Sequence, residues 1–397
     1  MLTRSTRFRL AAGGVALLTL GGITLAPAVA HRPSLVEALL GRYIVTLQDS
    51  VADPAAVAQG QAGLLGGTVD RVFASALKGY SASLPAAVLA GLRADPTVKA
   101  VEPDARVTLS ASQVNPPYGI DRIDQRYLPL NRSYAYATGG AGVQAYVLDT
   151  GVRRDHPEFA GRVAGGFNVL DRSADTRDCN GHGTHVSGIL ASSTYGVAKA
   201  ASVVPVKIFG CGSSTTLSAI LAGLDWATAD HRPGQKAVAN LSFDAGPSFA
   251  LDRAITALSN DGVAVAVAAG NESVNACGTS PARVPQVLTV AASDQRDAMA
   301  RFSNGGSCVD LFAPGVGILS ADSRSNGSFV MSGTSMAAPH VAGALARELS
   351  AGASTAQLAQ SRVLGRATPG VITGTGQRCA LLSGCRPGTP NLLLFTG

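Results

Sequence analysis

The clearest pattern along the chain is a series of short, nearly uninterrupted apolar runs, with segments of helical periodicity between some of them. The apolar runs cover residues 142–151, 203–210, 236–243, 263–271 and 284–293, and the helical segments cover residues 183–192, 216–229, 248–260 and 340–350. Strands buried on both faces have this composition, and helical crossovers join parallel strands. The pattern predicts an α/β fold with a central, mostly parallel sheet flanked by helices, and a functional site at the carboxyl ends of the strands.

A shorter segment before this region has a pattern of its own. It predicts, in order, a strand at residues 42–47, a helix at 53–66, a hairpin at 69–84, a second helix at 85–95 and closing strands at 98–109. This is a small α+β unit of about 70 residues, near the lower limit for an independent core. The polar, proline-containing segment 110–119 predicts a linker or a cleavage region.

The first thirty residues form a third pattern. Arg4, Arg7 and Arg9 precede an uncharged run at residues 10–25, and small residues that signal peptidase accepts end the segment at Ala28 and Ala30. A membrane anchor, the alternative, needs roughly 20 strongly apolar residues, and this run is shorter and diluted by glycine and threonine. Residues 1–30 are therefore predicted to be a signal peptide, and the mature protein is expected to be secreted and free of the membrane.

Composition narrows the range of partners. The 397 residues are 46% hydrophobic with a formal net charge of +6, and they contain no basic run of the kind that follows a phosphate backbone. We expect a globular protein that does not bind nucleic acid. An oxidising compartment would let the six cysteines pair, although their spacing alone does not choose the pairs.

Four residues at the ends of predicted elements have the side chains that nucleophilic catalysis needs. Asp149 and Asn271 end apolar runs, His182 opens a helical segment, and Ser335 lies in the small-residue stretch GTSMAAPH. A histidine takes the proton of a serine hydroxyl, a carboxylate orients that histidine, and an amide donates to a developing oxyanion. Pro339 is expected in the first turn of the following helix, where a missing N–H costs little.

Taken together, the motifs around these residues point to one family. VLDTGV, NGHGTHVSG, AAGN and GTSMAAPHVAG resemble the subtilisin-like serine proteases, and Asp149, His182 and Ser335 follow the chain order known for subtilisin. GIDRIDQRYLPL and STYGVAK resemble the proteinase K and aqualysin-like branch, and the similarity runs from about residue 113 to the C-terminal region. The resemblance implies a secreted serine endopeptidase that hydrolyses peptide bonds through an acyl-enzyme on Ser335.

The same resemblance implies a role for each of these side chains and for the leading segment. His182 would act as base and then acid, Asp149 would orient it, and Asn271 would bind the oxyanion. Residues 31–110, with a core at about 43–109, resemble the family's ferredoxin-like propeptide, which assists folding, inhibits the enzyme and is removed by self-cleavage. The expected cut between Ser110 and Ala111 leaves residues 111–397 as the peptidase domain. Its expected partners are polypeptide substrates and its own propeptide, and we expect a monomer.

Disulfide pairing is also implied by the resemblance. The family's two bridges correspond to Cys179 with Cys211 and Cys277 with Cys308. Cys379 and Cys385 would then pair locally, in an insertion that does not resemble the family. Each family bridge would contribute roughly 3 to 4 kcal/mol to stability in the loop-entropy treatment.

Structural calcium is the expected cofactor, because the family carries it and the chain has matching oxygen ligands. The stronger site would use Asp310 with the carbonyls of Pro285 and Val287, and the alternative is a capped turn. A second site would use the ligands of the stretch GIDRIDQ, where the alternative is a solvated acidic turn. Relatives carry Asp or Ser where this chain has Asn131. The ligands of this second calcium site would be Asp121, Asp124 and Gln125.

Two stretches correspond to the segments that flank the substrate in the family. They contribute Ser213, Ser214 and Thr215 on one side and Ser242, Phe243 and Asp244 on the other, and Ala268, Ala269 and Gly270 complete the expected cleft. Relatives are glycine-rich at both flanking stretches. A carboxylate at Asp244 would narrow the cleft and favour basic substrate side chains. The alternative is that Asp244 points to solvent.

Other functions remain as alternatives to be weighed. His182 and His185 have the H-x-x-H spacing of some zinc sites, but Gly183 stands where the zincin pattern requires glutamate. The glycines of residues 139–142 precede a predicted strand instead of following it, which argues against a dinucleotide site. A catalytically silent relative that acts as a binding module, or an esterase using the same acyl chemistry, stays open.

Overall fold

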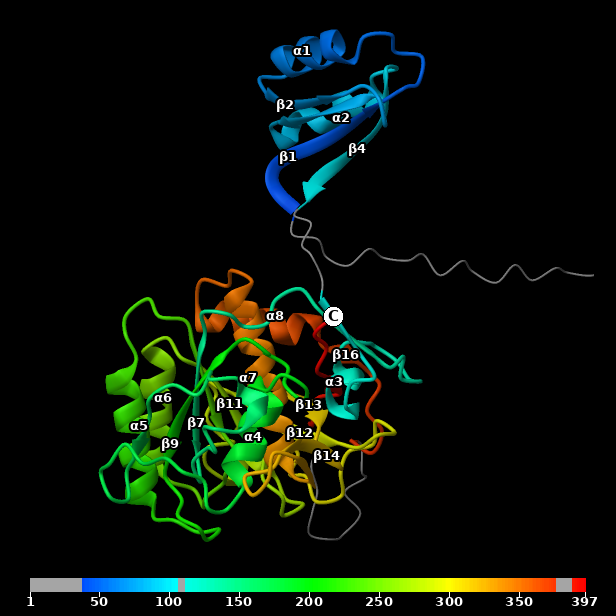
Figure 1. Ribbon diagram of the computed structural model, residues 1–397. Helices are drawn as coiled ribbons and strands as arrows, with labels where there is room; N and C mark the ends of the chain where they lie inside the picture. Colours follow the sequence, from blue (N-terminus) through cyan, green and yellow to red (C-terminus); the bar gives the residue numbers. More distant parts are fainter. Residues whose placement is uncertain (1–37, 106–110, 376–387) are drawn as a thin grey trace, which may run out of the picture. The chain divides into compact units, whose positions relative to one another are not determined.

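A computed structural model describes residues 38–105, 111–375 and 388–397 (Figure 1). The chain divides into two compact units, with the boundary between Thr108 and Leu109. The predicted signal peptide, the expected cleavage point after Ser110, and Cys379 and Cys385 lie outside the described residues. Within the part that is described, no helix combines the length and the apolar character needed to cross a membrane.

The amino-terminal unit is the small α+β domain that the sequence predicts. Its four-stranded antiparallel sheet has the order β2–β3–β1–β4. The side chains of Val45, Leu47 and Tyr80 are fully buried in its core. The region expected to hold several closing strands forms one described strand, and a 3₁₀ turn at Ala86–Val88 shortens the second helix. The elements are β1 (Ala38–Leu47), α1 (Pro54–Leu64), β2 (Thr68–Phe73), β3 (Gly79–Ser83), α2 (Leu89–Ala94) and β4 (Val98–Ala105).

The larger unit is built on a nine-stranded sheet. The strand order is β16–β17–β13–β12–β11–β10–β7–β9–β8, and every pair is parallel except β16 with β17. This agrees with the predicted α/β fold. The strands are β7 (Gln144–Asp149), β8 (Phe167–Asn168), β9 (Ser202–Lys207), β10 (Ala237–Leu241), β11 (Ala264–Ala268), β12 (Leu288–Ser293), β13 (Leu311–Pro314), β16 (Thr368–Pro369) and β17 (Leu392–Leu393).

Helices cover both faces of this sheet (Figure 1). Alternate residues of each strand point to opposite faces, so Val147 belongs to one core and its neighbours Tyr146 and Leu148 to the other. The first core is closed by α4 (His182–Ala191), α7 (Thr334–Ser350) and α8 (Ala356–Arg366), and the second by α5 (Leu217–Asp230) and α6 (Phe249–Asn260). Burial on both faces explains why the strands are continuous apolar runs in the sequence.

The parallel register brings three chain segments to one edge of the sheet. Val147 of β7 pairs with Asn240 of β10, and Asn240 pairs with Ala266 of β11. The segments that follow these three neighbouring strands therefore emerge side by side, since parallel strands end at the same edge. They begin at Thr150, directly after Asp149, and at Ser242 and Ala269.

One sequence prediction is wrong in detail. Much of the segment 110–119 is not a linker, because Ala111–Val114 forms β5, which pairs antiparallel with β6 (Ser133–Tyr136), and Tyr118–Ile123 forms the helix α3. The pairing satisfies backbone groups of a polar segment that lacks a strand-like apolar pattern. The hairpin of β14 (Ile318–Ala321) and β15 (Ser328–Met331) also lacked a prediction.

Candidate active site

The histidine at the start of α4 is held by the carboxylate at the end of β7. His182 Nδ1 lies 2.8 Å from Asp149 Oδ1 and 2.9 Å from Oδ2. Burial by itself disfavours the imidazolium, but the charge and hydrogen bond of Asp149, together with the charge of Asp178, raise the pKa of His182 above its ordinary value. With Nδ1 donating to Asp149, Nε2 is left as the basic nitrogen.

The start of α4 packs against the end of β7 so closely that a side chain would not fit between them. A Cβ at Gly183 would lie 2.2 Å from the Gly151 carbonyl oxygen. Asp178 secures the same turn, because its carboxylate accepts hydrogen bonds from the Gly181 and Thr184 amides at 2.8 and 2.9 Å. Asp178 was missed in the sequence, although an aspartate shortly before a helix start is a capping signal.

Ser335 is the second residue of α7, and its hydroxyl donates to the Ser242 carbonyl at 3.1 Å. The described structure shows no hydrogen bond between the Ser335 hydroxyl and His182. Ser242 in turn donates from its own hydroxyl to the Ser335 carbonyl at 2.8 Å. Two reciprocal bonds therefore fix the serine above the end of β10, between the strand that carries Asp149 and the strand that leads to Asn271.

The structure corrects the expected place of Pro339. This proline is the sixth residue of α7 and lies inside the helix instead of in its first turn. Without an N–H, it cannot donate to the carbonyl four residues earlier, which belongs to Ser335. The Ser242 hydroxyl donates to that carbonyl instead, so the missing helical hydrogen bond is replaced by the hydrogen bond that positions Ser335.

Asn271 is oriented by the residue before the serine. Its Oδ1 accepts from the Thr334 amide at 2.9 Å and from the Thr334 hydroxyl at 3.0 Å. The Thr334 hydroxyl accepts from the Gly270 amide at 3.2 Å, which closes the network. Since Oδ1 is engaged, the Nδ2 hydrogens of Asn271 are the available donors. Thr334 was also missed, and its only signal is its place inside GTSMAAPH.

The residues expected to flank a substrate lie at the same edge but differ in exposure. Ser213 and Ser214 are exposed, and Asp244 is exposed beyond the end of β10. The Phe243 side chain is buried against Phe209 and is therefore not available to a ligand. Although the residue is exposed, partial burial of its carboxyl group and the charge of Glu272 raise the pKa of Asp244. Thr215 lies beside Ser214, while Ser242, Ala268, Ala269 and Gly270 are buried.

A small pocket of about 50 Å³ lies beside His182. The β14–β15 hairpin and the segment joining its strands form its other wall, with Asp322, Arg324, Phe329 and Met331. This hairpin leads directly into the turn before Ser335. The hairpin therefore connects the wall of this pocket to the segment that carries the serine.

His185 does not act with His182 as a metal pair. Its Nε2 lies 3.1 and 3.0 Å from the carbonyls of Ile318 and Phe329, and burial lowers its pKa to about 4. No group of three or more histidine, cysteine or acidic side chains in the described ranges could hold a metal ion. The ring of His185 instead ties α4 to the β14–β15 hairpin.

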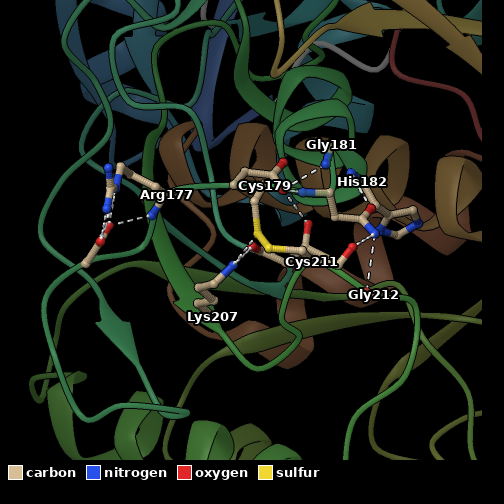
Figure 2. Close-up of a disulfide and its surroundings, with 11 residues drawn as sticks. Arg177, Cys179, Gly181, His182, Lys207, Cys211 and Gly212 are labelled. Carbon is tan, nitrogen blue, oxygen red and sulfur yellow. Dashed lines mark hydrogen bonds and ion pairs between the residues drawn. A yellow bond between two sulfur atoms is a disulfide. The ribbon is translucent and has the colours of Figure 1, made fainter.

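Among the described residues, two disulfides close loops of this unit. Cys179 is bonded to Cys211, and Cys277 is bonded to Cys308. These are the pairs that the family resemblance implies. The first connects the segment before α4 to the segment after β9 (Figure 2).

Comparisons with known proteins assign the chain. Residues 140–368 match the family described as the subtilase family, and residues 42–110 match the peptidase inhibitor I9 family. This chain belongs to the subtilase family. The subtilase match contains all four of the residues Asp149, His182, Asn271 and Ser335.

Individual relatives of this subtilase extend over nearly the whole chain. It is 44% identical over 384 residues to the extracellular serine proteinase of Thermus sp. (strain Rt41A), a match that covers 91% of this chain and 90% of the relative. It is 41% identical over 380 residues to the subtilisin-like serine protease AsES of Sarocladium strictum, with 94% and 93% covered.

A solved structure supports the fold. The crystal structure of a cold adapted subtilisin-like serine proteinase matches with a TM-score of 0.67 and 44% sequence identity, covering 71% of this chain and 99% of that chain. The predicted family and α/β fold are therefore confirmed. So is the enzyme class, because the chain is a subtilisin-like serine endopeptidase preceded by an inhibitor-type domain.

Proposed function

We propose that this subtilase cleaves polypeptides through an acyl-enzyme on Ser335, with His182, Asp149 and Asn271 as its other catalytic residues. The observation that carries the proposal is the His182–Asp149 pair at the end of β7, next to the strand above which Ser335 is anchored. His182 Nε2 has no hydrogen-bond partner in the described part of the chain. It is therefore the nitrogen available to take the serine proton.

The first chemical step moves a proton from the Ser335 hydroxyl to His182 Nε2 as the oxygen attacks the substrate carbonyl. The hydroxyl must then exchange its bond to the Ser242 carbonyl for one to the histidine. Asp149 stabilises the imidazolium that forms and holds the ring in the productive tautomer. In the second half of the step, the imidazolium gives its proton to the leaving amine, and the peptide bond breaks.

The developing oxyanion needs donors that are in place before the reaction. Asn271 Nδ2 supplies one, because Thr334 holds the other end of its amide. The backbone N–H of Ser335, in the first turn of α7, supplies a second and adds the positive end of the helix dipole. Each such donor contributes typically 10²- to 10³-fold to the rate.

The amino-terminal unit would act as propeptide and inhibitor of the enzyme. The inhibitor match over residues 42–110 ends at the residue before the expected cut between Ser110 and Ala111. Residues 111–397 would then be the mature enzyme, with residues 1–30 as its signal peptide. A relative named an extracellular serine proteinase supports secretion of this chain. Its name also supports polypeptides as the substrates of this chain.

Self-processing tests this proposal directly. The full chain should cut itself between Ser110 and Ala111 and then digest casein, whereas Ser335→Ala should stay full length. The amino-terminal sequence of the product and the casein assay provide the measurements. A wild-type chain that stays intact and leaves casein untouched would contradict the proposal, and cleavage of small esters alone would favour an esterase.

Calcium would stabilise the folded enzyme at two loops. Asp121 Oδ1 and Asp124 Oδ1 are both buried without a hydrogen-bond partner, and burial raises the pKa of Asp124 to about 6. Two orphaned carboxylate oxygens fit a hard divalent cation. Gln125 fits less well, since its Oε1 already accepts from the Asn131 amide at 2.9 Å.

The stronger calcium site would use Asp310 with the carbonyls of Pro285 and Val287. Burial raises the pKa of Asp310 to about 6, against the effect of a 2.7 Å hydrogen bond from the Thr289 amide. A carboxylate whose charge is disfavoured by burial gains most from a bound cation. The ion would tie the segment before β12 to the segment before β13.

Removal of calcium should therefore destabilise the enzyme. A chelator should lower the free energy of unfolding by about 2.7 kcal/mol if free calcium was 100 times its Kd. Thermal unfolding of the Ser335→Ala chain measures this without self-digestion. Asp310→Asn should abolish most of the calcium response, and Asp155→Asn, at an exposed aspartate, should leave it unchanged. Equal responses in the two variants would remove Asp310 from the site.

Asp244 would set part of the substrate preference. Its exposed carboxylate follows β10 at the edge where the substrate backbone is expected to pair. Besides burial, the charge of Glu272 raises the pKa of Asp244, so a second negative charge acts in this region. Basic substrate side chains should therefore be favoured over acidic ones near the scissile bond.

A further inference from the structure

The disulfide beside α4 is accessible to solvent and has a buried cation behind it. Cys179 and Cys211 are both exposed, whereas Lys207, the last residue of β9, is only 7% exposed. Lys207 Nζ lies 4.0 Å from Cys179 Sγ (Figure 2). It also donates to the Thr150 carbonyl. The ammonium thus contacts one of the two sulfur atoms, and that atom is Cys179 Sγ.

The acidic groups near Lys207 already have partners of their own. Asp175 is paired with Arg177 at 2.6 Å, and Asp149 is paired with His182. Asp178 accepts hydrogen bonds from backbone amides of the turn before α4. Asp171 completes the set of carboxylates whose charges act on Lys207, and burial of the lysine opposes them and lowers its pKa. A further anion at Cys179 would therefore find an ammonium that is poorly solvated and close to the sulfur.

We propose that the Cys179–Cys211 bridge is a thiol-exchange site at which a low-molecular-weight thiol is attached to Cys211. The attacking thiolate forms a bond to Cys211 Sγ, the sulfur–sulfur bond breaks, and its electron pair leaves on Cys179 as a thiolate. Lys207 stabilises that leaving group. No net oxidation or reduction occurs, because one disulfide is exchanged for another.

The direction of the exchange follows from the position of the charge. A leaving thiol of lower pKa leaves faster, and a cation in contact lowers the pKa of a thiol. Lys207 contacts Cys179 Sγ, so expulsion of Cys179 is favoured over expulsion of Cys211. The adduct should consequently form on Cys211.

The second disulfide of the same unit provides an internal reference. At Cys277 Sγ the structure shows a contact of 3.5 Å with the Ser307 hydroxyl, which is neutral. Cys277 and Cys308 are also less exposed than the other pair. Exchange at this bridge should be slower, by about tenfold or more, given the dependence of the rate on access and on the leaving group.

An adduct on Cys211 would also reach the substrate edge, a consequence that rests on the proposed function. Cys211 directly precedes the segment of Ser213 and Thr215, and the Asn180 side chain donates to the carbonyls of Cys211 and Gly212 at 3.1 and 3.2 Å. Asn180 Oδ1 accepts from the His182 amide at 3.2 Å. A group attached to Cys211 would thus change KM for peptides more than it changes esterolysis of a small ester.

The exchange itself is tested without any catalytic activity. The full-length Ser335→Ala chain is treated with 2-mercaptoethanol, and free thiols are trapped with iodoacetamide at successive times. Each cysteine-containing peptide, including those of Cys379 and Cys385, is then assigned by mass. We expect the mercaptoethanol adduct on Cys211 and the alkyl label on Cys179. Adducts formed mainly on Cys179, or faster exchange at Cys277–Cys308, would overturn the proposal.

Substitution of the lysine separates its charge from the effect of exposure. Lys207→Met should reduce the ratio of the two exchange rates by about tenfold, and Lys207→Arg should preserve it. An unchanged rate at Cys277–Cys308 shows that the Met variant is folded. If Lys207→Met does not fold, the position of the adduct in the Lys207→Arg chain still decides. An unchanged rate ratio in a folded Lys207→Met chain would overturn the role of Lys207.

Discussion

Two histidine–aspartate pairs lie in the described part of the larger unit, and they differ in what surrounds the second ring nitrogen. His182 Nδ1 lies 2.8 Å from Asp149, and His231 Nδ1 lies 2.6 Å from Asp261. His231 Nε2 is 3.0 Å from the Gln235 carbonyl, whereas His182 Nε2 has no partner among the described residues. The His182 side chain is 23% exposed and that of His231 only 2% exposed.

The comparison teaches that a carboxylate beside a histidine does not by itself make a base. In the pair of His231 both ring nitrogens are occupied by acceptors, and the pair joins the end of α5 to the end of α6. In the pair of His182 one nitrogen has no partner among the described residues, His182 lines a pocket, and the Asn271 amide is oriented by Thr334. The open nitrogen and its surroundings, more than the short distance to aspartate, distinguish a reactive pair from a structural one.

Removing the carboxylate from the open pair should have the largest effect. Asp149→Asn should lower kcat/KM for a peptide by about 10⁴-fold, because the histidine loses its orienting acceptor and the stabiliser of its charged form. Steady-state kinetics on a chromogenic peptide measure this loss. A fall of less than tenfold would break the comparison, since the two pairs would then be equally dispensable.

The oxyanion donor should come next in size. Asn271→Ala should lower kcat by about 10²- to 10³-fold with little change in KM, because its donation strengthens only as charge develops. Asn326→Ala, at an exposed amide bonded to Arg153, is a matched control and should leave kcat unchanged. Similar losses in the two variants would mean that asparagine truncation acts through stability.

The closed pair should affect stability instead of turnover. Asp261→Asn should leave kcat/KM within about twofold and cost about 1 kcal/mol of unfolding free energy, because the partly exposed acceptor of a hydrogen bond from His231 is weakened. Thermal unfolding in the Ser335→Ala background gives the stability. The acid limb of kcat/KM, which reports His182 with its raised pKa, should not move. A shifted limb would show that the pairs are coupled.

The smallest effect is expected at Asp244, an exposed carboxylate without a cation partner in the described structure. Asp244→Asn removes the charge at constant size, and Asp244→Gly also restores space. Each should reduce the preference for peptides with basic over uncharged side chains by about threefold. Competition between paired peptides measures the ratio. If Asp244→Gly leaves the ranking of charged and uncharged peptides unchanged, the carboxylate does not select substrates.

Much of this site was predictable because its residues sit at the ends of strongly patterned elements. The apolar runs before Asp149 and Asn271 predict buried strands, and the carboxyl ends of parallel strands meet at one edge. Thr334 and Lys207 were not predicted, because neither differs in the sequence from an ordinary polar residue. Their contacts, to Asn271 and to Cys179, join segments far apart along the chain.

The sequence by itself determined which residue types stand at the ends of the strands and helices, since hydrophobic periodicity and short motifs are local properties of the chain. The tertiary structure alone decided where each side chain points. His182 and His231 both have an aspartate partner, but only the packing leaves Nε2 of His182 open. The same packing formed β5 from residues 111–114. It also placed the Ser242 hydroxyl as donor to the Ser335 carbonyl, to which Pro339 cannot donate. Such contacts depend on how distant segments meet, which no local pattern records.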